Sequence, residues 1–585
     1  MNPAEARSLV EILEHRAERE PSRPAYGFLE DGERPGAPLT YGQLAEKAAR
    51  LAAALHAVGP PGERALLFFP PGLELVEAFW GCLRAGWVAV PAPISSPARL
   101  GRGLARLEAI GRDAGLAAIL TCGRFRGAAL ELAAAIGGPV AVVAIDELAE
   151  NFTAPPLPAD GDQVALLQYT SGSTAQPRAA VVCHKHLLYN LARVDHCQGN
   201  DEESVSLSWL PMAHDLGLVA GVLHPLYRGC PAWLMAPAAF LLRPLRWLEA
   251  IGLLRATNSG GPNFAFDLCV ARSRPEQREA LDLRSWRYAH LGGETVRAGT
   301  LAAFARAFAP AGFGAAALQP GYGLAEATLI VTAGRRGQRY RTQEISRRAL
   351  SGEGRVAPAE SERDSLEIVG CGAPVDGTEV KIVDSELGHL CPPGQVGEIW
   401  VSGPAVVNGY FRNKATTAAT FGARLAGAGD QAFLRTGDLG FLEGGELFVT
   451  GRLKDLIVVR GANHYPQDLE LCLERGEPRL KAGGSAAFAV ESDAGEAVVL
   501  VAEVSPAFRT DLRGEAGREL ALELREKVGR EHEVPIEAIV LLEPGRLLKT
   551  TSGKVRRQAC REAFLRGELA AIYHWQREPV PANAG

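Results

Sequence analysis

The sequence predicts an α/β protein with a large N-terminal region of parallel-sheet subdomains, a small β subdomain and a smaller C-terminal α/β unit. The chain has 585 residues, which exceeds the usual size of one domain. Short apolar segments alternate with amphipathic ones through residues 40–145, a pattern typical of parallel sheets covered by helices. Apolar segments at 379–383 and 396–401 predict the β subdomain, and strands and helices follow again in the tail.

The first predicted helix covers residues 4–19, where Leu9, Ile12 and Leu13 recur at helical spacing. Thr40 is the expected N-cap of a second helix, Tyr41–Val58. The strands and helices that we then expect in alternation are 65–69, 74–85, 88–92, 100–113, 117–121 and 140–145. In the tail, the expected elements are strands at 486–490, 497–504 and 538–542 and a helix at 515–528.

The composition narrows the classes of function. A net charge of -6 provides no basic surface for nucleic acid, so we expect no nucleic-acid partner. The ten cysteines form no Cys-x-x-Cys pair, which favours free thiols and a cytoplasmic location. The polar N-terminus has no signal-peptide pattern. Prolines and glutamates interrupt the most apolar region, 65–94, so we expect no transmembrane segment.

The segment Gln168–Arg178 has the composition of a phosphate-binding loop. It lies between two apolar segments, 164–167 and 179–183, and its hydroxyls surround Gly172. Polyphosphate oxygens only accept hydrogen bonds, so hydroxyls and turning backbone N–H groups suit them. The loop joins strand to strand, unlike the Gly-x-x-x-x-Gly-Lys-Ser/Thr loop, which opens into a helix. Taken alone, a polar surface hairpin explains the segment equally well.

Four further motifs follow in order: Tyr322–Glu326, Thr436–Asp438, Gly451–Asp455 and Thr551–Lys554. Together with the loop they resemble the adenylate-forming superfamily of acyl-CoA ligases, amino-acid adenylation domains and fatty acyl-AMP ligases. The resemblance covers nearly the whole chain. It implies an N-terminal adenylation domain at 1–453 and a mobile C-terminal lid domain at 454–585, with Lys454 and Asp455 as the hinge.

The resemblance also assigns the expected contacts of ATP, which is the implied substrate. The expected phosphate-binding residues are Thr170, Ser171, Gly172, Ser173 and Thr174. The expected adenine and ribose contacts are Gly292, Gly293, Glu294, Tyr322, Gly323, Asp438 and Arg452. Glu326 is the expected ligand of Mg²⁺, a hard cation that prefers carboxylate and phosphate oxygens. As structural alternatives, Tyr322 is a core aromatic residue and Glu326 a carboxylate early in a helix.

A second set of motifs concerns the acyl group. His214-Asp215-Leu-Gly217 resembles the His-Asp-x-Gly of acyl-activating relatives, whose histidine lines the junction of acyl pocket and nucleotide. Amino-acid adenylation domains instead carry Phe-Asp-x-Ser/Thr, and Phe266-Asp267 lacks the Ser/Thr. A plain carboxylate on an apolar tail is therefore the expected substrate. Gly260 and Gly261 resemble the stretch that shapes the acyl tunnel, although a simple turn explains them equally well.

The run Asn463–Asp468 and the polar segment 332–367 are closer to fatty acyl-AMP ligases than to CoA ligases, although the segment is also compatible with a solvated loop. The implied reaction joins a medium- or long-chain fatty acid to AMP, with release of pyrophosphate. The acyl group then passes to the phosphopantetheine thiol of an acyl carrier protein. In this reading Lys554, Glu326 and His214 are the catalytic residues, and Lys554 bridges the carboxylate and the α-phosphate.

Two alternatives stay open. A long-chain acyl-CoA ligase would use the same first half-reaction. A non-catalytic nucleotide- or lipid-binding module is suggested by Ala175 and Ala179, which stand where many relatives have glycine. Arg178 replaces a lysine there and keeps the charge with a different shape and reach.

Overall fold

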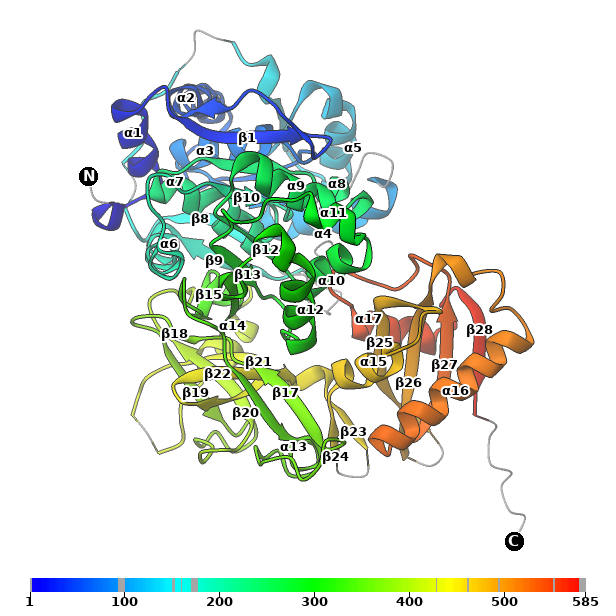
Figure 1. Ribbon diagram of the computed structural model, residues 1–585. Helices are drawn as coiled ribbons and strands as arrows, with labels where there is room; N and C mark the ends of the chain where they lie inside the picture. Colours follow the sequence, from blue (N-terminus) through cyan, green and yellow to red (C-terminus); the bar gives the residue numbers. More distant parts are fainter. Residues whose placement is uncertain are drawn as a thin grey trace.

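The computed structural model describes residues 3–92, 100–149, 153–158, 160–169, 177–427, 429–459, 462–492, 495–550 and 553–577. Two large sheets and a small antiparallel sheet make up the N-terminal part, and the C-terminal part forms a separate compact unit beside the small sheet (Figure 1). The α/β architecture predicted from the alternating segments is confirmed.

The first sheet has six strands in the order β7-β6-β4-β5-β8-β9. Their pairings are parallel except for the antiparallel hairpin of β8 and β9. The strands are β4 (Arg64–Leu67), β5 (Val88–Pro91), β6 (Ala118–Thr121), β7 (Ala141–Ala144), β8 (Val164–Tyr169) and β9 (Ala179–Cys183). The helices among them are α3 (Leu73–Arg84) and α4 (Leu100–Ala114), both close to their predicted bounds, and α5 (Arg126–Ile136).

The second sheet has ten strands, with the order β18-β15-β14-β13-β12-β10-β11-β1-β2 and β3 paired to β1. Its strands are β1 (Pro24–Glu30), β2 (Arg34–Pro35), β3 (Leu39–Thr40), β10 (Ser206–Ser208), β11 (Ala232–Met235), β12 (Asn258–Gly261), β13 (Tyr288–Leu291), β14 (Leu318–Gly323), β15 (Ile330–Ala333) and β18 (Ala373–Pro374). The helices here are α6 (His184–Gln198), α7 (His224–Arg228), α8 (Pro237–Leu242), α9 (Leu245–Leu254), α10 (Asn263–Ala271), α11 (Pro275–Glu279) and α12 (Ala298–Phe308). Because β12, β13 and β14 are parallel neighbours, their carboxyl ends meet at one edge.

Helix starts follow the capping chemistry. Thr40 caps α2 (Tyr41–Val58) and forms a capping box with Gln43, so the predicted bounds of this helix are confirmed. The first helix, α1, covers Leu9–Arg19 and not residues 4–19. The Ser8 side chain accepts a hydrogen bond from the Glu11 backbone N–H, and this cap fixes the start of the helix four residues after a short 3₁₀ turn ends at Glu5.

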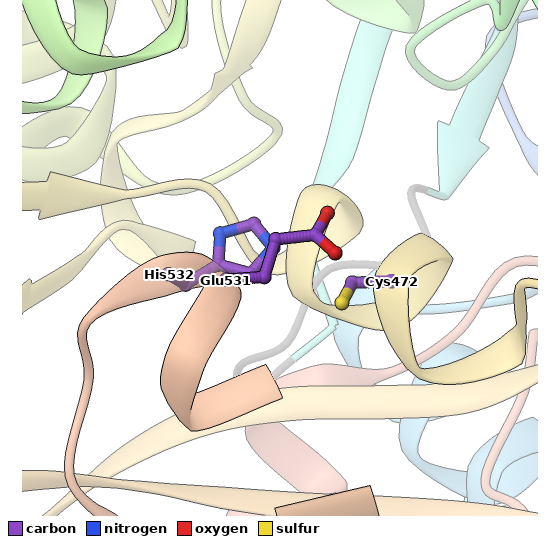
Figure 2. Close-up of side chains that lie close together, drawn as sticks. All are labelled: Cys472, Glu531 and His532. Atoms are coloured by element: carbon purple, nitrogen blue, oxygen red, sulfur yellow. The ribbon is translucent and has the colours of Figure 1, made fainter. Parts of the chain in front are cut away.

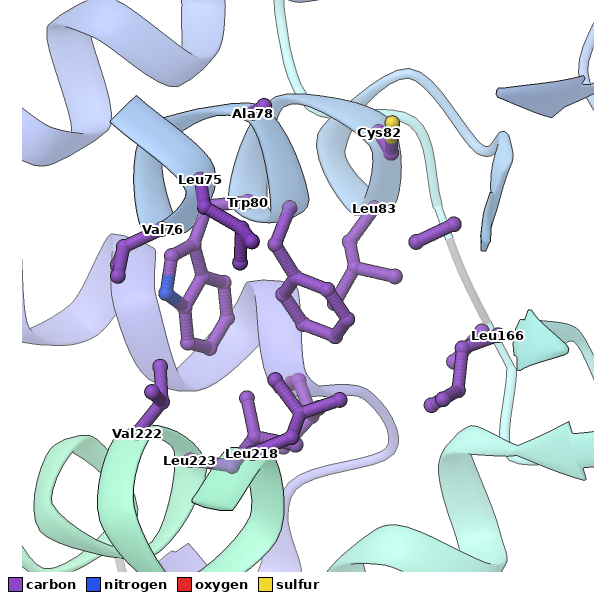
Figure 3. Packing of buried hydrophobic residues seen from close by; sticks show 14 of the residues in the cluster. Leu75, Val76, Ala78, Trp80, Cys82, Leu83, Leu166, Leu218, Val222 and Leu223 are labelled. Carbon is purple, nitrogen blue, oxygen red and sulfur yellow. The ribbon is translucent and has the colours of Figure 1, made fainter. Parts of the chain in front are cut away.

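The largest hydrophobic cluster lies where α2 and α3 meet η5, a π-helix at Leu216–Leu223. Figure 3 shows Trp80 and Leu83 of α3 above Leu218 and Val222 of η5. Trp80 and Leu218 are fully buried. Burial of large apolar side chains is the main favourable contribution to folding, so this packing holds η5, and the residues just before it, in a fixed position.

The small antiparallel sheet contains β19 (Glu379–Val383), β20 (Gly397–Ser402), β21 (Leu434–Glu443) and β22 (Glu446–Arg452), and α14 (Lys414–Phe421) packs on it. The polar segment 332–367 is folded and is not merely a solvated loop. It contains β16 (Thr342–Ser346) and α13 (Arg347–Glu353), and β17 (Ser365–Val369) closes its hairpin. Ile345 and Leu350 are buried and anchor it.

The C-terminal unit follows a 3₁₀ turn, η9 (Leu453–Asp455). Its strands are β23 (Ile457–Val459), β24 (Ala462–His464), β25 (Leu480–Ser492), β26 (Gly495–Val504), β27 (Ile536–Leu542) and β28 (Ala571–Gln576). Its helices are α15 (Pro466–Glu474), α16 (Glu515–His532) and α17 (Arg557–Leu565). Two hydrophobic clusters of its own lie on the faces of its four-stranded sheet. Among the described residues, no helix is long and apolar enough to cross a membrane.

Candidate active site

A cavity of about 700 Å³ lies between the large N-terminal part and the C-terminal unit. Strand ends of the ten-stranded sheet, the β21–β22 pair and a turn of the C-terminal unit all contribute to its walls. The sequence-predicted residues that line it are His214, Asp215, Gly292, Gly293, Glu294, Tyr322, Gly323, Glu326, Asp438, Arg452, Lys454, Asp455 and Lys554. Motifs separated by more than 300 residues in the sequence, such as His214 and Lys554, therefore meet at one place.

Lys554 reaches this cavity from a turn that begins at Thr550. The Lys554 backbone N–H donates to Thr550 Oγ1 at 3.0 Å, and the Thr550 N–H donates to the Lys554 carbonyl at 2.8 Å. Lys554 Nζ lies so close to Gly293 that a Cβ atom on this glycine would be 3.0 Å away. The ammonium group is therefore held directly against the backbone that follows β13.

Gly553 makes this approach possible. Its φ is +87°, a conformation that L side chains rarely adopt, and a Cβ atom there would lie 2.5 Å from Phe264 Cε1. Phe264 belongs to α10 of the large N-terminal part. Both the backbone conformation and the close contact require glycine at this point of the turn.

Asp215 and His214 form a close pair beside Lys554. His214 Nδ1 lies 2.5 Å from Asp215 Oδ1, and the Leu216 backbone N–H donates to the same oxygen at 2.7 Å. Burial alone would raise the pKa of Asp215, but His214 and Lys554 together lower this pKa to about 2. Asp215 is thus a carboxylate at neutral pH, and it also caps η5.

Asp438 accepts hydrogen bonds from two sides. Tyr322 Oη donates to Asp438 Oδ2 at 2.8 Å, and Arg452 Nε donates to Oδ1 at 2.7 Å. Asp438 and Arg452 are directly paired across β21 and β22, so the sheet register sets this contact. Burial and the nearby Asp438 charge raise the pKa of Tyr322, and Asp438 raises that of Arg452. Tyr322 is both a buried aromatic residue and part of the cavity wall.

Glu326 projects into the cavity from a 3₁₀ turn rather than from the start of an α-helix. Tyr410 Oη donates to its Oε1 at 2.7 Å. Burial raises the pKa of Glu326, and Tyr410 opposes this shift. A partly buried carboxylate with a raised pKa gains from a nearby cation, which fits a single protein ligand of Mg²⁺.

Several predicted positions lie elsewhere. Gly260 and Gly261 belong to β12 and are buried behind the cavity wall, since the His290 ring covers Gly260 and the Trp209 ring covers Gly261. They make room for these rings and lie in a strand rather than a turn, and their expected place beside the acyl tunnel stays a prediction. Gly217 is likewise buried, within η5 and against the Pro211 carbonyl.

Glu294 lines the cavity, but its carboxylate is already bound. Asn263 donates to Glu294 Oε1 from its backbone N–H and from its side-chain Nδ2, both at 2.9 Å. Residues Thr170–Thr174 lie outside the described part of the chain. The described residues that flank this loop, Tyr169 and Arg178, line the cavity.

The predicted hinge makes contacts that sequence reasoning missed. Arg557 binds Asp455 at 3.4 Å and Glu470 at 2.6 and 2.7 Å. Gln558 Nε2 donates to the Lys454 carbonyl at 3.1 Å. In the sequence Arg557 is one of several cations that follow Lys554, and nothing in this spacing reveals a partner 87 residues away.

Segment 332–367 contacts the C-terminal unit, because α13 packs against β24, as Figure 1 shows. Near this contact, ligand atoms of Cys472, Glu531 and His532 lie within 4.8 Å of one another (Figure 2), a spacing that suits a metal ion. Arg475 already pairs with Glu531, and burial and Glu531 raise the pKa of the Cys472 thiol to about 12. These features disfavour a cation at this cluster.

Comparisons with known proteins agree with the geometry. Residues 13–411 match the AMP-binding enzyme family, and residues 454–574 match the AMP domain of Disco-interacting protein 2-like proteins. The chain is 42% identical to the medium-chain-fatty-acid–[acyl-carrier-protein] ligase JamA of Moorena producens (strain JHB), over 97% of each chain. It is 36% identical to the long-chain-fatty-acid–AMP ligase FadD26 of Mycobacterium tuberculosis (strain ATCC 25618 / H37Rv), over 96% of this chain and 98% of that one.

Similar solved structures include the fatty acyl-adenylate ligase of L. pneumophila in complex with acyl adenylate and pyrophosphate. It is 36% identical to this chain, covers 98% of both chains and superposes with a TM-score of 0.74.

Proposed function

The chain belongs to the family of AMP-binding enzymes, and we propose that it is an ATP-dependent fatty acyl-AMP ligase. It joins a medium- or long-chain fatty acid to AMP with release of pyrophosphate. It then transfers the acyl group to the phosphopantetheine thiol of an acyl carrier protein. The observation that carries this proposal is the position of Lys554, which lies against Gly293 and beside Asp215 in the cavity that Asp438 and Arg452 also line.

In the first half-reaction a carboxylate attacks the α-phosphorus of ATP, and the two anions repel each other. A fixed cation at the point where negative charge builds up lowers this barrier. Lys554 supplies that cation, because its ammonium group is held at the end of β13. The ionised Asp215 lies beside Lys554, and Asp215 itself is oriented by His214 and by the Leu216 N–H.

ATP is held by other groups that line the cavity. Asp438 is fixed between Tyr322 and Arg452, and its carboxylate accepts hydrogen bonds from ribose hydroxyls. Arg452 is exposed over 61% of its side chain, so its remaining N–H groups can reach the nucleotide. Glu326 would hold Mg²⁺, which neutralises phosphate charge when it is bound. In this proposal the residues Thr170–Thr174 bind the phosphates.

The substrate carries a plain carboxylate and no amine. Asp267 of the Phe-Asp pair is bound by Arg297 at 2.7 Å, and Asp215 is bound by His214. Neither carboxylate is therefore free to hold a substrate ammonium group. This supports a fatty acid over an amino acid.

The second half-reaction requires the C-terminal domain, residues 454–585, to rotate about Lys454 and Asp455 so that a thiol can enter. We place the enzyme in the cytoplasm, because its ten cysteines carry free thiols and nine of these are buried.

Comparing acceptors after adenylation tests the whole assignment. We expect pyrophosphate release with a fatty acid and ATP, followed by thioester formation on holo acyl carrier protein in preference to coenzyme A. Equal or faster production of acyl-CoA would instead support an acyl-CoA ligase. Binding of ATP without pyrophosphate release would support a non-catalytic module.

A further inference from the structure

His290 is an unusual residue in the wall of the cavity. It lies on β13, and both of its ring nitrogens, Nδ1 and Nε2, are buried without a hydrogen-bond partner among the described residues. Burial, with a small contribution from His224, lowers the pKa of His290 to about 4. The ring is therefore neutral at physiological pH and offers one N–H donor and one acceptor nitrogen.

Other polar side chains around His290 have partners. Tyr288 Oη donates to the Gly334 carbonyl at 3.0 Å, and Gln319 Nε2 donates to the Ala316 carbonyl at 2.8 Å. His224 Nε2 lies 3.2 Å from Asp195 Oδ1. The protein thus satisfies the neighbouring polar groups and leaves the imidazole of His290 without a partner. Buried polar groups are nearly always hydrogen-bonded, so we expect a polar group of a bound ligand to be the hydrogen-bond partner of this ring.

Glycine at position 260 provides room for the ring. Gly260 and His290 are register partners on adjacent parallel strands, and a Cβ atom on Gly260 would lie 2.1 Å from the His290 carbonyl oxygen and 2.6 Å from His290 Cδ2 and Cγ. Any larger residue at position 260 would therefore clash with both the backbone and the imidazole of His290. The ring therefore has a defined place in the wall.

His290 also lies close to the reacting groups. It precedes Gly293 by three residues, a span of at most about 10 Å along the backbone, and Gly293 contacts Lys554. Cys197 and Ala333 line the cavity together with His290. An acyl chain whose carboxylate meets Lys554 and whose tail enters this part of the cavity would pass the imidazole.

We propose that His290 selects acyl chains that carry an oxygen function, a hydroxyl or keto group, at the carbon that lies beside its ring. This inference rests on the proposed acyl-adenylating function and specifies the class of fatty acid. A hydroxyl can either accept from the imidazole N–H or donate to the unprotonated nitrogen, depending on which one faces the chain, whereas a keto oxygen can only accept from the N–H. A saturated chain would leave both nitrogens without a partner, and sites that hydrogen-bond a substrate group discriminate strongly against analogues that lack it.

The test compares dodecanoic acid with its monohydroxy and monoketo derivatives, with the oxygen at successive carbons. Pyrophosphate release gives kcat/KM for each acid with the wild type, His290→Phe and His290→Gln. For the wild type we expect one oxygenated isomer to exceed dodecanoic acid by roughly tenfold or more. His290→Phe should abolish this preference, mainly through KM. His290→Gln, which keeps a donor and an acceptor, should retain part of it.

The outcomes distinguish a failure of the selective role of His290 from a failure of the proposed adenylating function. If kcat/KM of the wild type for dodecanoic acid equals or exceeds that for every oxygenated isomer, the selective role of His290 is overturned while the adenylating function stands. The same conclusion follows if His290→Phe keeps the preference. If no acid supports pyrophosphate release, both the selective role and the function are overturned. An unchanged KM for ATP in both variants verifies that the fold and the nucleotide site are intact.

Discussion

Arg557 of α17 lies 3.4 Å from Asp455 and so connects the C-terminal unit to the predicted hinge. The same guanidinium makes two short bonds to Glu470, and all three side chains are largely buried, with exposures of 19%, 17% and 12%. Asp455 and Glu470 raise the pKa of Arg557, so it stays charged. The predicted hinge residue Asp455 is thus part of a buried ionic network.

Replacing Arg557 with alanine should lower the stability of the C-terminal unit by about 3–5 kcal/mol, because two buried carboxylates lose their partner. Urea unfolding followed by tryptophan fluorescence of Trp575 measures this change. Arg566→Ala is a control at the opposite end of the same helix, since its pair with Glu562 is more than half exposed. It should cost less than about 1 kcal/mol. Equal losses in the free energy of unfolding for the two variants would contradict a stabilising role of the buried ionic network.

Removing the Tyr322 hydroxyl should weaken ATP binding. In Tyr322→Phe, Asp438 loses the 2.8 Å hydrogen bond that orients it, and a hydrogen bond to a charged group contributes about 1.5–3 kcal/mol. We expect KM for ATP to rise roughly tenfold or more, with a smaller change in KM for the fatty acid. Tyr288→Phe removes a hydroxyl bound to a backbone carbonyl and should leave KM for ATP unchanged.

Gly553→Ala should slow adenylation, because the added Cβ atom would meet the Phe264 ring at 2.5 Å and displace Lys554. Gly545→Ala is the matched control. Its φ of +79° carries a similar backbone penalty, but nothing lies within 4 Å of the added atom. Both variants should lose stability in thermal unfolding, and only Gly553→Ala should lose kcat. A comparable loss of kcat in Gly545→Ala would show that backbone strain alone is responsible.

Asp468 should make stability depend on pH. Burial raises its pKa to about 6, above the ordinary value of 3.8, although Arg347 opposes the shift. Between these two values the folded state holds a proton that the unfolded state has lost. Stability from this group therefore falls as pH rises from about 4 to about 6, by at most about 1.4 kcal/mol per pH unit.

Asp468→Asn should flatten this part of the stability profile and stabilise the protein at neutral pH. Urea midpoints at several pH values measure both effects. An unchanged slope in the variant would assign the pH dependence to other groups.

Much of the fold could be predicted because local patterns determine it. The cap at Thr40 set the start of α2, and the alternation of apolar segments gave the order of strands and helices in the first sheet. The bounds of α1 were wrong because Ser8 is a better cap than the residues before it. The fold of segment 332–367 depends on a few apolar residues, such as Ile345 and Leu350, in a largely polar stretch, and this signal is weak.

The candidate site was partly predictable for a different reason. The residues that we propose contact the nucleotide lie in short motifs, whereas the residues that support them lie wherever the fold brings them. Tyr410 binds Glu326 from 84 residues away, and His290 fills the space above Gly260. Such pairs depend on sheet register and on packing between distant segments, which a single sequence does not reveal.

The most direct test of the central claim is pyrophosphate release from ATP with a chain-length series of fatty acids, measured for the wild type and Lys554→Ala. Lys549→Ala is the control, because Lys549 donates to the Gly483 carbonyl rather than lining the cavity. We predict a chain-length optimum for the wild type, a loss of roughly 10²–10³-fold in Lys554→Ala, and near-normal rates in Lys549→Ala. Release at the wild-type rate from Lys554→Ala, or no release with any fatty acid, would contradict the account.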